Sequence, residues 1–369
     1  MDLNSSNFRE DLDIDHGGNI HDASIKLDMC SSQIIDASAS IVPFNPPPQI
    51  FNCLKNTINK INISHYPDIN YTYLIESIAK DHNVYPNMVL PGNGASELIT
   101  WAARDASITG KSTLFEPSFS DYERALKCWN GKYDFIPLDM ELNSHMRELN
   151  LTNKNRDVLW ITNPHNPTGH LWSRESITRL LNHFKLIICD EAFLSLCPLG
   201  KNESLIPLTK TFNNLIVIRS LTKLYAIPGL RLGYAITSSK RINNWRNFRD
   251  PWPINQFANN VGIQIMNDNS LKESWNIKIN KWISSEGKRL NKNLNSINNI
   301  KAYLSTTNFQ LIHSPKPLNY LRDKLFRQGI ILRDCSKFKN LGPNWLRISL
   351  QTKKNNDRII NAIKDINCN

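Results

Sequence analysis

The most constraining feature of this chain of 369 residues is a series of short apolar runs, most of them separated by helix-length segments. Each run has the length and apolar content of a buried strand. Strands that alternate with helices form a mostly parallel sheet covered by helices on both faces, so the sequence predicts an α/β fold. The predicted strands span 112–115, 132–136, 158–162, 186–189, 215–220 and 232–236.

Apolar residues at helical spacing flank this region on both sides, whereas residues 1–49 are predicted to form an arm or loop. The predicted helices span 50–63, 71–82, 95–104, 241–248, 257–282 and 283–298, and further strands lie near 309–313 and 345–350. We therefore expect an arm and helix at 1–59 that contribute to a small domain. A large sheet domain at 60–250 and a carboxyl-terminal small domain at 251–369 complete the prediction.

Composition excludes several classes of protein. The 44 Lys and Arg against 33 Asp and Glu give a net charge of +11, but these residues are scattered, so we expect no nucleic-acid partner. The seven cysteines never form a CxxC pair, which predicts neither a metal site nor a disulfide frame and favours the cytoplasm. No apolar run approaches the ~18 residues that a membrane span needs, so we expect no membrane partner.

Lys223 gives the strongest chemical signal. It follows the predicted strand 215–220, has Ser220 and Thr222 beside it, and lies eight residues before Arg231. Ligands of open α/β sheets bind outside the carboxyl ends of the strands, and lysine is the residue that binds carbonyl cofactors covalently. A solvated loop lysine is the alternative. It is disfavoured because the surrounding residues are apolar or small, where an unused ammonium is costly to bury.

Two more polar residues follow predicted strands. Asp190 ends the strand at 186–189, and Asn166 lies in a turn with two Asn-Pro pairs after the strand at 158–162. Taken alone, an acid at this place is commonly a helix cap, and the turn is commonly only a rigid loop. The order and the spacing add weight, since Asp190 lies 24 residues after Asn166 and 33 residues before Lys223.

In this order and at these spacings, the residues resemble the class I/II aminotransferase family of fold-type I pyridoxal-phosphate enzymes over nearly the whole chain. The resemblance implies a large, mostly parallel sheet domain, a smaller α+β domain, pyridoxal 5'-phosphate as cofactor and a homodimer. It also implies that Lys223 binds the cofactor covalently and later moves protons at the substrate. Asp190 would pair with the ring nitrogen, and Asn166 would donate to the ring's phenolate oxygen.

The same resemblance assigns the remaining contacts of the cofactor. Phe119 matches the aromatic residue that stacks on the ring, and Tyr66 matches a tyrosine that reaches the partner subunit's cofactor phosphate. Phe193 departs from the tyrosine that many members carry, so the phenolate oxygen would lose one donor. The residues implied to hold the cofactor phosphate are Gly94, Ala95, Ser96, Ser220, Thr222 and Arg231.

Within the family, the stretch from His16 to Asn19, Phe193 and the segment around Arg333 resemble the threonine-phosphate decarboxylases of cobalamin biosynthesis. Histidinol-phosphate aminotransferases come next. The resemblance implies decarboxylation of L-threonine O-3-phosphate to (R)-1-amino-2-propanol O-2-phosphate, with His16, Asn19, Arg333 and Arg347 binding this small anionic amino-acid phosphate. Two alternatives stay open: an aminotransferase, and a binding or regulatory protein that keeps the fold without turnover.

Overall fold

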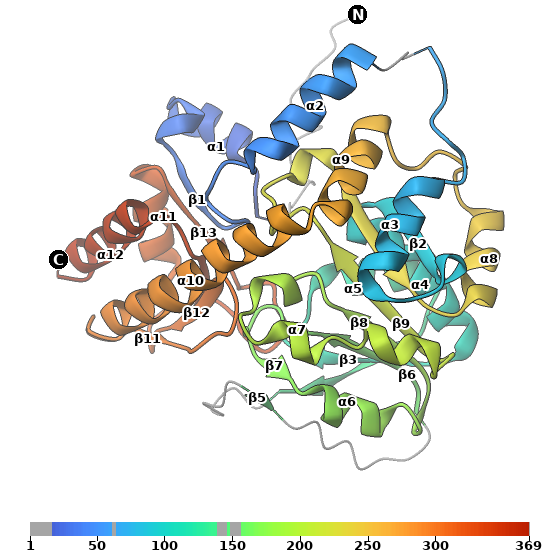
Figure 1. The fold of residues 1–369 in the computed structure, drawn as a ribbon. Coiled ribbons are helices and arrows are strands. Elements are labelled where there is room, and N and C mark those ends of the chain that lie inside the picture. The colour runs from blue at the N-terminus through green and yellow to red at the C-terminus, as the bar shows by residue number, and fades with distance from the viewer. Residues whose placement is uncertain (1–16, 61–63, 139–145, 148–155, 369) are drawn as a thin grey trace, which may run out of the picture.

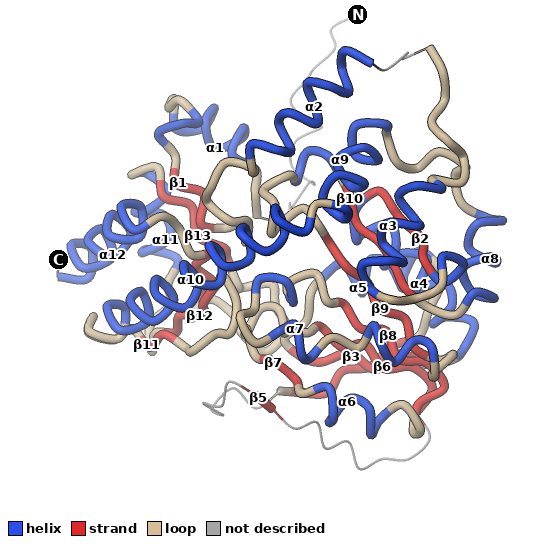
Figure 2. The backbone as a smooth tube through the Cα atoms, in the orientation of Figure 1, coloured by secondary structure: helices blue, strands red, loops and turns tan. Residues whose placement is uncertain are grey.

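The computed structural model describes residues 17–60, 64–138, 146–147 and 156–368, and its centre is a seven-stranded sheet (Figures 1 and 2). The strand order is β2-β10-β9-β8-β6-β3-β4, and only β10 runs antiparallel to its neighbours. The α/β fold class predicted from the sequence is therefore confirmed. The strands are β2 (Val89–Asn93), β3 (Ser112–Glu116), β4 (Tyr133–Pro137), β6 (Arg156–Thr162), β8 (Phe184–Asp190), β9 (Leu215–Ser220) and β10 (Leu232–Ile236).

Helices cover both faces of this sheet, which explains why its strands are apolar throughout rather than alternating. Leu159 and Ile187 belong to the core on one face, and Trp160 and Ile188 belong to the core on the other. The first core includes α3 (Thr72–His82), α6 (Arg174–Leu180) and α9 (Gln256–Asn267). The second includes α4 (Gly94–Thr109), α5 (Ser120–Cys128) and α8 (Ser239–Phe248).

A second sheet of five strands lies beside the first, in the order β1-β13-β14-β12-β11 (Figure 1). Four of its strands come from the last third of the chain, and β1 (Ile35–Ala37) pairs in parallel with β13. The others are β11 (Lys301–Ala302), β12 (Phe309–His313), β13 (Ile330–Asp334) and β14 (Trp345–Ser349). The helices of this part are α1 (Ile20–Leu27), α10 (Asn269–Leu294), α11 (Asn319–Arg327) and α12 (Lys353–Cys368).

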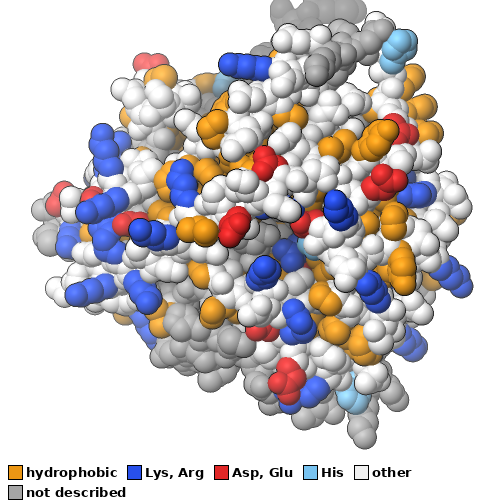
Figure 3. Space-filling view, viewed as in Figure 1, with side chains coloured by type: hydrophobic (Ala, Val, Ile, Leu, Met, Phe, Trp, Pro, Cys, Tyr) orange, Lys and Arg blue, Asp and Glu red, His pale blue; other side chains and the backbone are white. Residues whose placement is uncertain are grey.

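Two more helices and a two-stranded sheet lie beside these two sheets. Helix α2 (Pro48–Lys60) packs on α9, α7 (Gly200–Glu203) is a single turn, and β5 (Met146–Arg147) pairs with β7 (Leu171–Trp172). Among the described residues, no helix combines the length and the apolar character that crossing a bilayer requires. On the face drawn in Figure 3, Lys and Arg side chains are spread among acidic and uncharged ones rather than gathered in one patch.

Two details of the predicted elements are wrong. Residues before 49 are more than an arm, because α1 and β1 lie there; Asn19 caps α1 by accepting a hydrogen bond from the Asp22 N–H. The helix predicted over 257–282 is two helices, since α9 ends at Asn267 and α10 continues past the break predicted after residue 282. Asp268 separates them, because its carboxylate accepts from the Leu271 N–H and so caps α10.

Candidate active site

Polar side chains at the carboxyl ends of the central strands line one cavity of about 240 Å³. Strands β6, β8 and β9 are neighbours and end at Thr162, Asp190 and Ser220, all of which line the cavity. This is the edge at which open α/β sheets bind ligands. The predicted site residues that line the cavity are Ala95, Ser96, Phe119, Asn166, Asp190, Ser220, Thr222, Lys223, Arg231, Arg333 and Arg347.

Asp190 and Lys223 face the cavity with opposed charges. The Asp190 carboxylate accepts one hydrogen bond from the Ala192 N–H at 2.9 Å and one from the Tyr122 hydroxyl at 2.8 Å. Burial raises the pKa of Asp190 and lowers the pKa of Lys223, and the charge of each residue partly offsets this effect on the other. The Lys223 Nζ lies 4.7 Å from the centre of the Phe193 ring.

An anion-binding cradle lies at the start of α4. Gly94 has φ +75°, and a Cβ there would lie 2.5 Å from an Arg231 terminal nitrogen, so a side chain would displace the guanidinium. The hydroxyl oxygens of Ser220 and Thr222 lie 2.7 Å apart at the end of β9. The N–H groups of a helix amino terminus, two hydroxyls and a guanidinium are groups that can bind a phosphate together.

Arg347 fixes the orientation of Asn166. Its guanidinium donates to Asn166 Oδ1 at 2.5 Å and to the Ser38 carbonyl oxygen at 3.0 Å. Because a guanidinium only donates, Oδ1 must face Arg347, which leaves the Asn166 amide nitrogen to donate toward the cavity. The Arg347 Nε has no partner among the described residues, and burial lowers the pKa of this residue to about 10. It therefore stays charged at neutral pH.

Two cations stand on neighbouring strands of the second sheet. The register of β13 and β14 places Arg333 directly opposite Arg347, and both side chains line the cavity. Arg333 is half-buried and its guanidinium carbon lies 5.5 Å from the centre of the Phe338 ring. The second sheet thus contributes two positive groups to the cavity, which suits a ligand with more than one negative group.

Other predicted site residues lie elsewhere. Asn19 caps α1, and Tyr66 is 77% exposed and stacks on Trp252 with ring centres 4.2 Å apart. Neither lines the cavity, so their roles stay predictions. His16 lies outside the described residues, but Gly17 lines the cavity, where a Cβ would lie 2.6 Å from the Ser38 carbonyl oxygen.

Two residues that support the cavity wall were not predicted from the sequence. Tyr122 contacts Asp190, and Ser38 binds Arg347 through its carbonyl. Tyr122 follows Phe119 by three residues at the start of a helix, a spacing that places both on one face and could have revealed it. No local pattern marks Ser38, because its partner lies in β14 at the other end of the chain.

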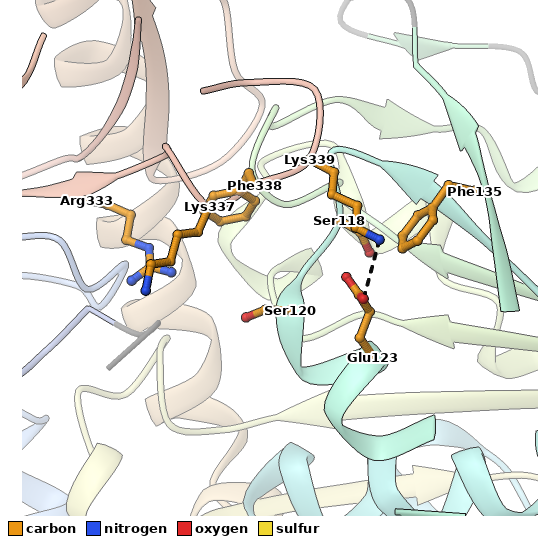
Figure 4. Close-up of a pocket in the computed structure, with 8 residues that line it drawn as sticks. All are labelled: Ser118, Ser120, Glu123, Phe135, Arg333, Lys337, Phe338 and Lys339. Carbon is orange, nitrogen blue, oxygen red and sulfur yellow. Dashed lines mark hydrogen bonds and ion pairs between the residues drawn. The ribbon is translucent and has the colours of Figure 1, made fainter. Parts of the chain in front are cut away.

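A smaller pocket adjoins the cavity and shares Arg333 and Phe338 with it (Figure 4). Its wall joins the segment between β13 and β14 to the large sheet. Lys339 from that segment pairs with the Glu123 carboxylate at 3.5 Å, and its Nζ lies 3.6 Å from the centre of the Phe135 ring. The contact brings the second sheet's connecting segment against α5 and β4.

Comparison with known proteins identifies the family. The family model for aminotransferases of class I and II matches residues 27–363. The chain belongs to the class I and II aminotransferases. It is 29% identical over 361 residues to the threonine-phosphate decarboxylase of Salmonella typhimurium, covering 95% of this chain and 96% of that protein. It is also 29% identical over 332 residues to a histidinol-phosphate aminotransferase of Caldanaerobacter subterraneus, covering 89% and 92%.

Solved structures of both kinds of enzyme have the same fold, each with a TM-score of 0.79. The L-threonine-O-3-phosphate decarboxylase of Porphyromonas gingivalis superposes with a TM-score of 0.79 at 25% identity, covering 90% of this chain and 99% of that one. The chain is thus an enzyme of the pyridoxal-phosphate-dependent decarboxylase or aminotransferase type, and its cofactor is pyridoxal 5'-phosphate. The cavity fits this cofactor, because it combines a buried amine, a buried carboxylate and a phosphate cradle.

Proposed function

We propose that the protein decarboxylates L-threonine O-3-phosphate to (R)-1-amino-2-propanol O-2-phosphate in cobalamin biosynthesis. The observation that carries the proposal is the pair of facing arginines, Arg333 and Arg347, in the wall of the Lys223 cavity. Threonine phosphate bears a carboxylate and a phosphate, so it offers one anion to each cation. Histidinol phosphate bears only a phosphate and leaves one arginine without a substrate anion. The 32% identity to a putative threonine-phosphate decarboxylase of Caldanaerobacter subterraneus supports the same choice.

In this proposal some residues hold the cofactor and others orient the substrate or move a proton. When bound, pyridoxal phosphate withdraws electrons from the substrate bond that stands perpendicular to its ring. Asp190 holds the ring nitrogen, Asn166 donates to the phenolate oxygen and the α4 cradle holds the phosphate. Arg333 and Arg347 orient the substrate so that the bond from Cα to the carboxylate is the perpendicular one. After carbon dioxide has left with cleavage of this bond, Lys223 would deliver a proton to Cα, where the electron pair forms the new C–H bond.

The experiment that tests the proposal needs no keto acid. The purified, cofactor-loaded protein is mixed with L-threonine O-3-phosphate, and carbon dioxide and the phosphorylated amine are followed. We expect both products in equal amounts. Absence of carbon dioxide, together with amino transfer from histidinol phosphate to 2-oxoglutarate, would instead make the protein an aminotransferase.

The proposal includes a cytoplasmic homodimer in which Tyr66 reaches the partner subunit's cofactor phosphate. The surface around Tyr66 supports this, because Ile69 and Tyr73 are also more than half exposed. Exposed apolar side chains gathered in one region are typical of subunit interfaces. Sedimentation equilibrium measures the mass directly, and a monomer at the enzyme's working concentration would contradict this part of the proposal.

A further inference from the structure

Tyr122 is a buried residue behind the cavity wall, in contact with Asp190, that the proposed function does not use. It lies in the first turn of α5, and its hydroxyl donates to Asp190 Oδ2 at 2.8 Å. The Thr162 hydroxyl oxygen lies 2.7 Å from the Tyr122 hydroxyl oxygen. Since the one proton of Tyr122 goes to Asp190, Thr162 is the donor in the second bond. The three groups form a directed chain from Thr162 through Tyr122 to the carboxylate.

The ring of Tyr122 is held by packing on two sides. It meets Phe119 edge-on, with ring centres 5.5 Å apart and planes at 87°, and it lies against Trp160 at 5.1 Å. Phe119 lines the cavity and is the residue assigned to stack on the cofactor ring. One side chain therefore contacts both the group assigned to the ring nitrogen and the group assigned to the ring face.

We propose that Tyr122 is a positioning residue that sets how Asp190 and Phe119 meet the cofactor ring. This inference rests on the roles proposed for these two residues. The hydroxyl holds Asp190 Oδ2 in one place, the Ala192 N–H holds Oδ1, and the carboxylate cannot rotate away from the cavity. A hydrogen bond to the ionised form also makes the carboxylate a weaker base, so it leaves the proton on the ring nitrogen.

The groups around Asp190 shift its pKa in both directions, so the hydrogen bond from Tyr122 affects how strong a base the carboxylate is. Burial and the nearby charge of Asp121 favour the protonated acid, whereas Lys223, the Tyr122 hydroxyl and the Ala192 N–H favour the carboxylate. Removing the hydroxyl alone leaves every other group in place. The carboxylate then becomes a stronger base and competes with the ring nitrogen for its proton.

The substitution Tyr122→Phe tests the proposal, because it keeps the ring packing and removes only the hydroxyl. The main measurement is the ¹⁵N chemical shift of the ring nitrogen in protein loaded with labelled pyridoxal phosphate. We expect it to move toward the value of an unprotonated ring. We also expect cofactor affinity to fall by about tenfold, as for loss of a hydrogen bond to a charged group, and kcat to fall more than KM changes.

Tyr133→Phe is the matched control. The Tyr133 hydroxyl also donates to a carboxylate, Glu123 Oε2 at 2.9 Å, but outside the cavity. We expect this variant to keep both the nitrogen shift and the cofactor affinity. Tyr122→Phe behaving like Tyr133→Phe would overturn the proposal.

Two further variants separate the possible failures. Asp190→Asn should by itself move the ¹⁵N chemical shift of the ring nitrogen. If it does not, the role proposed for Asp190 is wrong as well. If Asp190→Asn moves the shift and Tyr122→Phe does not, only the role proposed for Tyr122 is wrong. Thr162→Val loses the donor that orients the Tyr122 hydroxyl, so the ¹⁵N chemical shift should move less far in the same direction. Thr162→Ser keeps a hydroxyl donor and should return the chemical shift to its value in the unmodified protein. If Tyr122→Phe folds poorly, these two variants of Thr162 test the proposal in its place.

Discussion

Phe193 stands where its ring touches both the reactive amine and the second sheet. The Lys223 Nζ lies 4.7 Å from its centre, and Phe309 of β12 packs edge-on against it at 5.1 Å. A tyrosine here would add a hydroxyl donor for the phenolate oxygen of the cofactor. That donor would stabilise the negative oxygen, which then holds the neighbouring proton less tightly.

We therefore expect Phe193→Tyr to lower the pH at which the visible absorption band of the bound cofactor changes, by about one unit. A pH titration of this band checks the prediction. Phe248→Tyr, at an exposed position of α8, is the control and should leave the titration unchanged. A titration of Phe193→Tyr without a downward shift means that the added hydroxyl does not reach the phenolate oxygen.

Arg333 is expected to decide what happens to the substrate phosphate. If it holds that group so that the Cβ–O bond lies in the plane of the cofactor ring, phosphate cannot leave before Cα is protonated. Arg333→Ala should then release inorganic phosphate in place of aminopropanol phosphate, which a phosphate assay beside product chromatography measures. Lys324→Ala, a cation on the surface of α11, is the control. An unchanged ratio of products in Arg333→Ala would remove this role.

Some residues of the site were accessible from the sequence and others were not. Asn166, Asp190 and Lys223 each follow an apolar run, and parallel strands bring such ends together, so local pattern and topology suffice. Tyr122 and Ser38 are different. Their importance comes from hydrogen bonds to residues 68 and 309 positions away, which no window of the sequence contains.

At the scale of elements, His82 joins the end of α3 to the sheet. Its Nε2 shares a hydrogen bond of 2.6 Å with the hydroxyl of Tyr234 on β10. Burial lowers the pKa of His82 to about 4, and the positive charges of Arg219 and Lys272 act in the same direction against the opposing charge of Asp81. The folded protein therefore keeps this histidine neutral at pH values where the unfolded chain protonates it.

The sign of the resulting pH dependence follows from linkage. Because the folded pKa lies below the unfolded value of ~6.5, His82 contributes stability above pH ~6.5 that is lost as pH falls to about 4. His82→Gln should reduce the slope of unfolding free energy against pH in this interval by up to ~1.4 kcal/mol per unit. Chemical denaturation at several pH values measures it. His183 is exposed, and His183→Gln is the control. If it changes the slope equally, the burial of His82 between α3 and the sheet does not cause the pH dependence.

Elements with local causes were predicted better than elements with distant partners. The strands β9 and β10 agree with their predicted ranges, because each is a continuous apolar run in the buried sheet. Strand β1 has three residues and exists because β13 lies beside it. The junction of α9 and α10 depends on a single capping aspartate, Asp268, inside a long helical pattern.

At the scale of the whole molecule, the two sheets meet across the cavity, and the segment between β13 and β14 forms one of their contacts. Asn340 donates to the Glu116 carboxylate at 2.6 Å, and Lys339 pairs with Glu123. Phe338 of this segment and Arg333 of β13 both line the cavity. The division into a large domain at 60–250 and a small domain at 251–369 remains a proposal. In that division, a change in the relative position of the two domains would alter this contact and so move the nearby cavity residues.

Loosening that contact should weaken substrate binding before it affects stability. Each exposed ion pair or hydrogen bond of this kind contributes ~0.2–1 kcal/mol, so Lys339→Ala together with Asn340→Ala should raise KM by about two- to thirtyfold. We expect kcat and the melting temperature to change little, because both residues are exposed and neither lines the cavity. High salt should mimic the Lys339→Ala part, since an exposed ion pair is screened. Lys111→Ala removes an exposed ion pair with Asp134 inside the large sheet domain and is the matched control. Equal KM values in the two variants would show that Arg333 reaches its substrate position without this contact.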